Sequence, residues 1–215
     1  MDKLKFANIN REGSTRINML ESKTDQYVKF GQYNAFPNDL IELYNNSSIH
    51  NTCVNAIVDG IVGEGLTADP EYVLKRANSK DESWNDVFKK VAQDYKLYGG
   101  FAMEVIWNKS RTRVAEVYHI DFSWLRAKEK NYRGQIPGYY VSDEWNENYR
   151  YGTAPVDDMP YLPVFDPNTN MAEPKQIYVF NPYRPGQKYY PLPDYIGALR
   201  DVELDIETSN FHVNN

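Results

Sequence analysis

Apolar residues recur every three or four positions in the first half of the chain, which is the spacing of one face of a helix. This pattern predicts a short helix after Pro37, a second helix ended by Gly63, and a third over residues 83–98. We interpret the apolar stripe of the second helix as core packing, with Cys53 as a small buried hydrophobe. The positions of this stripe are Ile49, Cys53, Val54, Ile57, Val58 and Ile61.

After Gly100 the chain changes to short segments rich in β-branched and aromatic residues, which predict strands. The first four predict an antiparallel meander of three to five strands, and a further strand resumes after a long irregular excursion over residues 142–174. Five prolines in that excursion argue against a helix or a central strand. The predicted strand segments are 101–107, 113–120, 124–127, 136–141 and 176–180.

Helices followed by strands predict an α+β fold, in which N-terminal helices pack on an antiparallel meander and a long helix ends the chain. That last helix begins at Asp194 and has an apolar stripe opposite an acidic face. It lacks a capping glycine or a proline stop, so we expect it to continue into a region not present here. The predicted parts are an extended arm (1–35), an α+β domain (36–190) and the start of this helix (191–215).

Composition narrows the classes of function. The chain has 215 residues with 24 Lys and Arg against 30 Asp and Glu, a net charge of −6. This balance disfavours tight binding of a nucleic-acid backbone, which needs a concentrated basic face. The single cysteine excludes an intramolecular disulfide and fits a reducing compartment. The absence of a long apolar run favours a soluble protein without a membrane partner.

The motifs that carry catalysis are missing from the sequence. His50, His119 and His212 lie far apart and outside metal-ligand spacings, and no nucleophile elbow or phosphate-binding glycine loop occurs. The sequence therefore predicts no catalytic residue, no cofactor and no metal site. A hydrolase with carboxylates brought together by the fold is the weakest of the alternatives, because their spacing does not support it.

Aromatic residues crowd the second half of the chain, where tyrosine-rich loops can contact a partner at low entropy cost. They equally fill strands and the loops that return from them, so both interpretations stay open. A carbohydrate- or peptide-binding module is the alternative function that these residues suggest. The candidate partner-interface residues are Tyr139, Tyr140, Trp145, Tyr149, Tyr151 and Tyr161.

Four stretches together resemble the N-terminal half of the portal protein of tailed bacteriophages. They are a helix that leads to Gly65-Leu66 (49–62), a helix, glycine turn and strand (94–107), a further strand (117–126), and a turn that starts a long helix (189–215). The resemblance spans roughly residues 27–215. The turn has Pro191-Leu192-Pro193 where portals commonly have Gly-Leu-Ser-Pro, which is a departure from the family pattern.

This resemblance implies the outer wing of a portal subunit, cut before the stem and the clip. Portals form rings, usually of twelve subunits, at one capsid vertex. DNA passes through the channel without sequence-specific binding, driven by a separate terminase, and a tail adaptor attaches below. The implied partners are further copies of the chain, terminase, capsid protein, the tail adaptor and DNA. The implied location is the virion, with the host cytoplasm during assembly, and no enzymatic role is implied.

Overall fold

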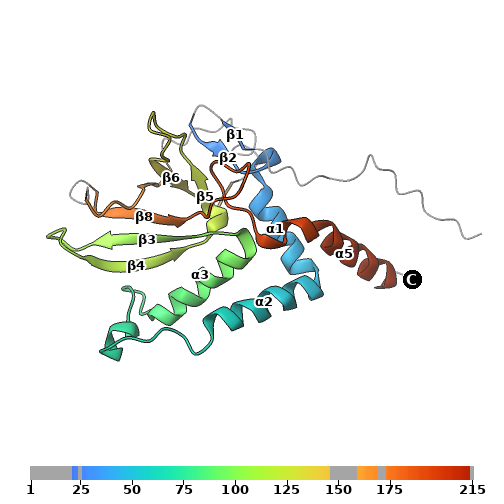
Figure 1. The fold of residues 1–215 in the computed structure, drawn as a ribbon, viewed down its shortest axis with the longest axis horizontal. Helices are drawn as coiled ribbons and strands as arrows, with labels where there is room; N and C mark the ends of the chain where they lie inside the picture. The colour runs from blue at the N-terminus through green and yellow to red at the C-terminus, as the bar shows by residue number, and fades with distance from the viewer. Residues whose placement is uncertain (1–20, 24–25, 146–158, 169–172, 214–215) are drawn as a thin grey trace, which may run out of the picture.

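A computed structural model describes residues 21–23, 26–145, 159–168 and 173–213, and it shows a short hairpin, then helices, then strands and a last helix (Figure 1). The predicted α+β class is therefore confirmed. The helices are α1 (Phe36–Asn46), α2 (Ser48–Val62), α3 (Trp84–Tyr98) and α5 (Leu199–Val213). Short 3-10 turns are η2 (Gln32–Asn34), η3 (Glu71–Lys75), η4 (Phe122–Trp124) and η5 (Asp194–Ala198).

Local signals explain the bounds of α3. The Ser83 hydroxyl accepts a hydrogen bond from the Asp86 N–H at 3.1 Å, and the Asp86 carboxylate accepts one from the Ser83 N–H at 2.8 Å, which forms a capping box. Gly99 ends the helix with a left-handed φ of 85°. A Cβ atom at Gly99 would lie 2.1 Å from the Leu192 carbonyl oxygen, so a larger residue does not fit there.

The strands form two three-stranded antiparallel sheets instead of one meander, with a separate hairpin near the N-terminus. An isolated bridge between Val164 and Ile177 links the two sheets. The hairpin is β1 (Ser22–Lys23) and β2 (Val28–Lys29). One sheet has the order β4 (Val114–Ile120), β3 (Phe101–Trp107), β8 (Lys175–Phe180), and the other has β5 (Leu125–Ala127), β6 (Gly138–Val141), β7 (Tyr161–Pro163).

Strand β7 corrects the prediction that residues 142–174 are irregular throughout. It pairs with β6 and includes Pro163, which lies opposite Gly138. Because β7 is at the edge of its sheet, a proline at its end removes no hydrogen bond between central strands. The prolines therefore exclude a central strand here but not an edge strand.

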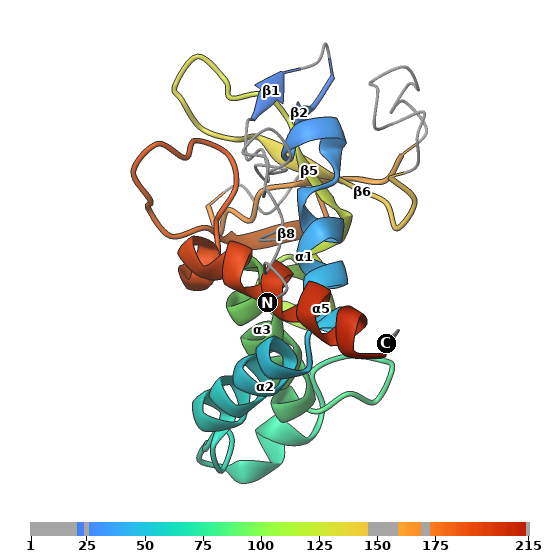
Figure 2. The ribbon, with the colours of Figure 1, turned by 90° about the vertical axis from the view of Figure 1, so that its right-hand side faces the viewer.

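The main hydrophobic core joins segments from both ends of the described chain. Val28 and Phe30, which lie in the predicted arm, pack in the same cluster as Leu199 of α5. Figure 2 shows α5 lying beside α1, and Val202 and Ile206 of α5 pack against this core. The division of the chain into arm, domain and helix remains a prediction.

Arg126 of β5 is fully buried and holds three segments together. Its Nη1 donates to the carbonyl oxygens of Ser123 at 2.8 Å and Leu125 at 2.7 Å, and its Nη2 donates to the Asn34 carbonyl at 2.8 Å. Its Nε donates to the Asn34 side chain. The Trp145 ring covers the guanidinium, with 4.8 Å between Cζ and the ring centroid. These bonds tie η2 to η4 and β5.

A hydrogen bond between side chains joins α3 to β4. The Asp94 Oδ2 lies 2.9 Å from His119 Nε2 and accepts a hydrogen bond from the Phe122 N–H at 3.0 Å. Burial raises the pKa of the Asp94 carboxyl to about 6, and the hydrogen bond from His119 partly opposes this rise. Asp121 and Tyr98 are the other ionisable groups around it, and the Tyr98 hydroxyl donates to Asp121 at 3.2 Å.

The first prediction concerns Arg126→Met, which removes the guanidinium and leaves buried carbonyl groups without donors. The free energy of unfolding should fall by about 3 kcal/mol or more. Urea denaturation measures the change. Arg113→Met, at an exposed arginine just before β4, should change it by less than about 0.5 kcal/mol. Equal stability of the two variants would contradict the role of Arg126 in the fold.

The second prediction concerns the pH dependence of stability. Asp94 binds its proton more tightly in the folded chain than in the unfolded chain, so its contribution to stability is present at low pH and is lost as the pH rises through about 6. Relative to Asp94→Asn, the wild type should lose about 2 kcal/mol of stability between pH about 4 and about 7. Urea denaturation across this range tests it, with the exposed Asp143→Asn as the control, and parallel curves would refute it.

Candidate functional site

Helix α2 carries an apolar surface that no other described element covers. Ser47 caps the helix by accepting a hydrogen bond from the His50 N–H at 3.1 Å, and Val54 and Val58 pack against Ala92 of α3. The remaining apolar positions face outward, so the interpretation of the whole stripe as core is wrong for them. We call these outward residues the α2 stripe; they are Ile49, 62% exposed, Cys53, exposed, Ile57, 47% exposed, and Ile61, 40% exposed.

Polar contacts fix the rotation of α2 and therefore the direction of the α2 stripe. The Tyr44 hydroxyl of α1 donates to Asn55 Oδ1 at 2.7 Å, and the Asn51 amide donates to the Tyr44 carbonyl at 3.2 Å. The Asn55 amide in turn donates to Asn51 Oδ1 at 2.8 Å. At the start of the helix, the Ser47 hydroxyl donates to Asp205 of α5 at 2.7 Å. A rigid framework thus presents the stripe outward.

A second apolar feature is a groove of about 480 Å³ on the sheet that contains β3, β4 and β8. Its floor comes from alternate positions of β3, Met103 and Val105, which point to one face of the sheet. The groove is also lined by Trp84 of α3 and Tyr178 of β8. Its other lining residues are Val73, Arg76, Ala77, Val114, Ala115, Glu116, Val117 and Phe165.

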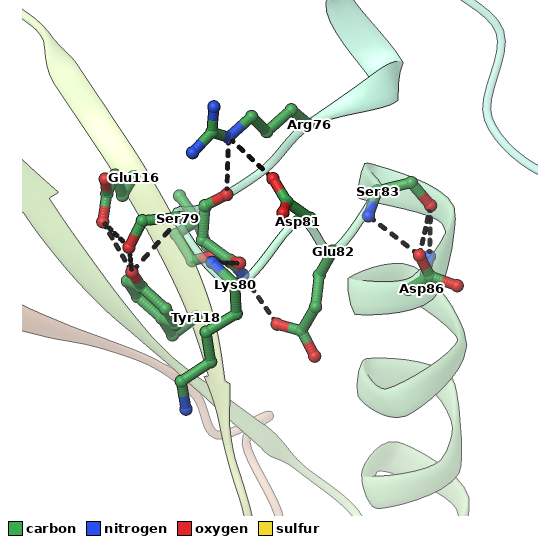
Figure 3. A network of polar contacts seen from close by, with 11 residues as sticks. Arg76, Ser79, Lys80, Asp81, Glu82, Ser83, Asp86, Glu116 and Tyr118 are labelled. Carbon is green, nitrogen blue, oxygen red and sulfur yellow. Dashed lines mark hydrogen bonds and ion pairs between the residues drawn. The ribbon is translucent and has the colours of Figure 1, made fainter.

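One wall of the groove is a loop that covers the edge of β4. The Ala77 carbonyl accepts a hydrogen bond from the Val117 N–H at 3.0 Å, and the Asn78 amide donates to the Val117 carbonyl at 3.0 Å. Figure 3 shows the polar network that extends this attachment, in which Tyr118 contacts Ser79 at 2.6 Å and donates to Glu116 at 2.6 Å. The loop thus pairs with a strand edge that would otherwise be open.

The buried ionisable pair of the described residues lies outside the two cavities described here. Asp94 and His119 form a buried pair, but neither lines the groove or a second cavity of about 240 Å³ beside Tyr95 and Asp194. Burial lowers the pKa of His50, which packs against the Tyr195 ring. Within the described residues, no three His, Cys, Asp or Glu side chains are grouped to hold a metal ion.

Four of the six predicted aromatic interface residues lie in the part of the chain that the structure describes, and the role of the set as an interface remains a prediction. Tyr139 is 3% exposed and belongs to the main core, and the rings of Tyr140 and Tyr161 pack on each other with centroids 5.2 Å apart. Trp145 stacks on Arg126, and its Nε1 donates to the Trp124 carbonyl at 3.0 Å. Tyr149 and Tyr151 lie outside the described residues.

Several exposed residues were not predicted as interface positions. The α2 stripe was assigned to the core because a helical period identifies an apolar face without saying what covers it. Exposed rings that are scattered along the chain gave no periodic signal; they are Tyr72, Tyr132, Tyr183 and Phe211. Among the described helices, none is both long enough and apolar enough to cross a membrane.

Comparison with known proteins gives the fold. No family model matches the sequence, and no curated protein matches it. Among solved structures, a chain from the virion of the native gene transfer agent particle is 14% identical, with a TM-score of 0.61 over 82% of this chain. Chains from the neck of the empty particle, computed with C6 symmetry, and of the native particle, computed with C12 symmetry, give TM-scores of 0.57 and 0.56 at 13% and 14% identity.

These matches cover 82% to 83% of this chain but only 45% to 46% of the chains from the particles. This chain therefore spans less than half the length of the structures that it resembles. At such identities the likeness concerns the fold, which this chain shares with part of a virion and neck chain.

Proposed function

We propose that this chain is part of a structural subunit in the neck of a phage-like particle, and more specifically the wing of a portal protein. The observation that carries the proposal is the shared fold over 82% of the chain with a virion chain of the gene transfer agent particle. The portal-like segments of the sequence support the same assignment independently, since they come from residues and not from coordinates.

The proposed subunit is one copy in a ring, with twelve copies as the expected number. A neck chain with a similar fold comes from a structure computed with C12 symmetry, which supports this number. DNA would pass through the ring without sequence-specific contacts, and a net charge of −6 suits a protein that must not hold DNA tightly. Terminase, capsid protein and a tail adaptor are the further proposed partners, in the virion and, during assembly, in the host cytoplasm.

We assign the α2 stripe to the contact between neighbouring copies. Contiguous exposed apolar surface is uncommon on monomers and marks a contact with another molecule. In a ring every subunit meets its neighbours through two different surfaces, so one exposed surface can be buried without a self-complementary partner. The stripe also has no charged side chain among its four positions, so burying it leaves no unpaired charge.

The third prediction tests this assignment with Ile57→Asp. A carboxylate in the middle of the stripe would lose its hydration when a neighbour covers it, so self-association should weaken at least tenfold. Size-exclusion chromatography with light scattering over a concentration series measures the association, and electron microscopy shows whether rings form. The control is Thr52→Asp, which places the same charge at an exposed position of α2 outside the stripe.

The outcomes separate the proposed function from the proposed surface. The ring is tested on a version of the protein that includes the proposed stem and clip, because the present chain by itself is expected to be monomeric or weakly associating. A longer version that stays monomeric at every concentration would contradict the ring. Wild-type rings that Ile57→Asp leaves intact would contradict only the assignment of the α2 stripe. If both variants disrupt the rings equally, a charge at any exposed position of α2 interferes with assembly. This result would also contradict the assignment of the α2 stripe to the contact between copies.

A further inference from the structure

Three successive backbone N–H groups near the C-terminal end of the domain converge on one carboxylate, that of Glu21. The Glu21 Oε1 accepts hydrogen bonds from the N–H of Tyr189 at 2.7 Å and of Tyr190 at 2.9 Å. The Lys188 N–H reaches both oxygens, at 3.2 Å from Oε1 and 3.1 Å from Oε2. Converging backbone N–H groups form an anion-binding concavity, and bonds to an ionised acceptor are stronger than neutral ones.

The contacts of a fully buried tyrosine hold the site in place. Tyr190 is fully buried, and its ring stacks on Phe30 with centroids 4.1 Å apart and planes inclined by 5°. Its hydroxyl accepts a hydrogen bond from the Ala127 N–H at 2.9 Å and donates to the Val28 carbonyl. Because Tyr190 cannot shift without breaking these contacts, its N–H keeps its direction whether or not Glu21 is present.

The surroundings of the site favour an anion. The Lys130 side chain lies above the Tyr189 ring, with 4.8 Å between Nζ and the ring centroid, and Nζ donates to the Lys188 carbonyl. A positive charge therefore lies close to Lys188 and Tyr189, two of the three residues that supply the N–H groups. No carboxylate besides Glu21 contacts these N–H groups among the described residues.

We propose that the backbone of residues 188–190 is a carboxylate-binding site and that Glu21 is its intramolecular ligand. The bound carboxylate fixes the chain directly before β1, and β1 pairs with β2, whose Val28 contacts Tyr190. Glu21 thereby holds the N-terminal hairpin against the core. When Glu21 is replaced, the site remains and takes a free carboxylate. This inference does not depend on the proposed role in a particle neck.

The fourth prediction compares Glu21→Gln with Glu42→Gln, which makes the same change at an exposed glutamate of α1. Glutamine keeps the shape of the side chain but loses the charge, so the amides of residues 188–190 should exchange with solvent at least tenfold faster in Glu21→Gln. Hydrogen exchange followed by mass spectrometry measures this. If these amides are equally protected in the wild type, Glu21→Gln and Glu42→Gln, the proposed role of Glu21 in holding the hairpin is wrong.

A second measurement tests whether the site itself binds a carboxylate. In Glu21→Ala, sodium acetate should restore the protection of the 188–190 amides and raise the melting temperature relative to sodium chloride at equal ionic strength. The wild type, whose site is occupied, should respond equally to the two salts. Equal responses of Glu21→Ala to acetate and chloride would overturn the carboxylate site and reduce Glu21 to a packing contact.

Discussion

The buried guanidinium of Arg126 is the constraint on which the arrangement of the other elements depends. Burial lowers the pKa of Arg126 to about 10, so the group still carries its charge at neutral pH, inside the core. No carboxylate contacts it among the described residues; carbonyl groups and the Asn34 side chain accept its hydrogen bonds. Since a buried charge without acceptors is very unfavourable, folding has to bring these acceptors to Arg126 together.

This requirement explains the unusual backbone before α1. Tyr33 and Asn34 both have positive φ, of 58° and 62°, in a region that non-glycine residues seldom occupy. In that conformation Asn34 presents its carbonyl and its side chain to Arg126, and the same Oδ1 accepts a hydrogen bond from the Phe30 N–H at 3.0 Å. The bonds to Arg126 offset the backbone strain and place Phe30 next to Tyr190.

What the sequence could predict depends on the range of the interaction. The capping box at Ser83 and the helix end at Gly99 depend on residues that are close in the sequence, and the strand around Met103 is rich in β-branched and aromatic residues. The bounds of these elements can therefore be predicted to within a few residues. Arg126 gave no signal, because its partner Asn34 is 92 positions away. Glu21 meets Tyr189 across 168 positions for the same reason. Long-range polar contacts of this kind leave no periodic trace in a sequence.

The α2 stripe shows a different limit of sequence interpretation. A helical period records which face of a helix avoids water in the working state of the protein, whether its own chain or another one covers that face. Helix α3 covers only Val54 and Val58 of the apolar residues of α2. The contacts between Tyr44, Asn51 and Asn55 fix the rotation of α2 about its axis, so the α2 stripe cannot turn toward the core. Exposing a large aliphatic side chain forgoes about 1.5 kcal/mol or more of burial free energy. A second chain that covers Ile49, Ile57 and Ile61 would recover this free energy. Because Asn55 fixes the rotation of α2, the α2 stripe is already oriented for such a contact before the second chain binds.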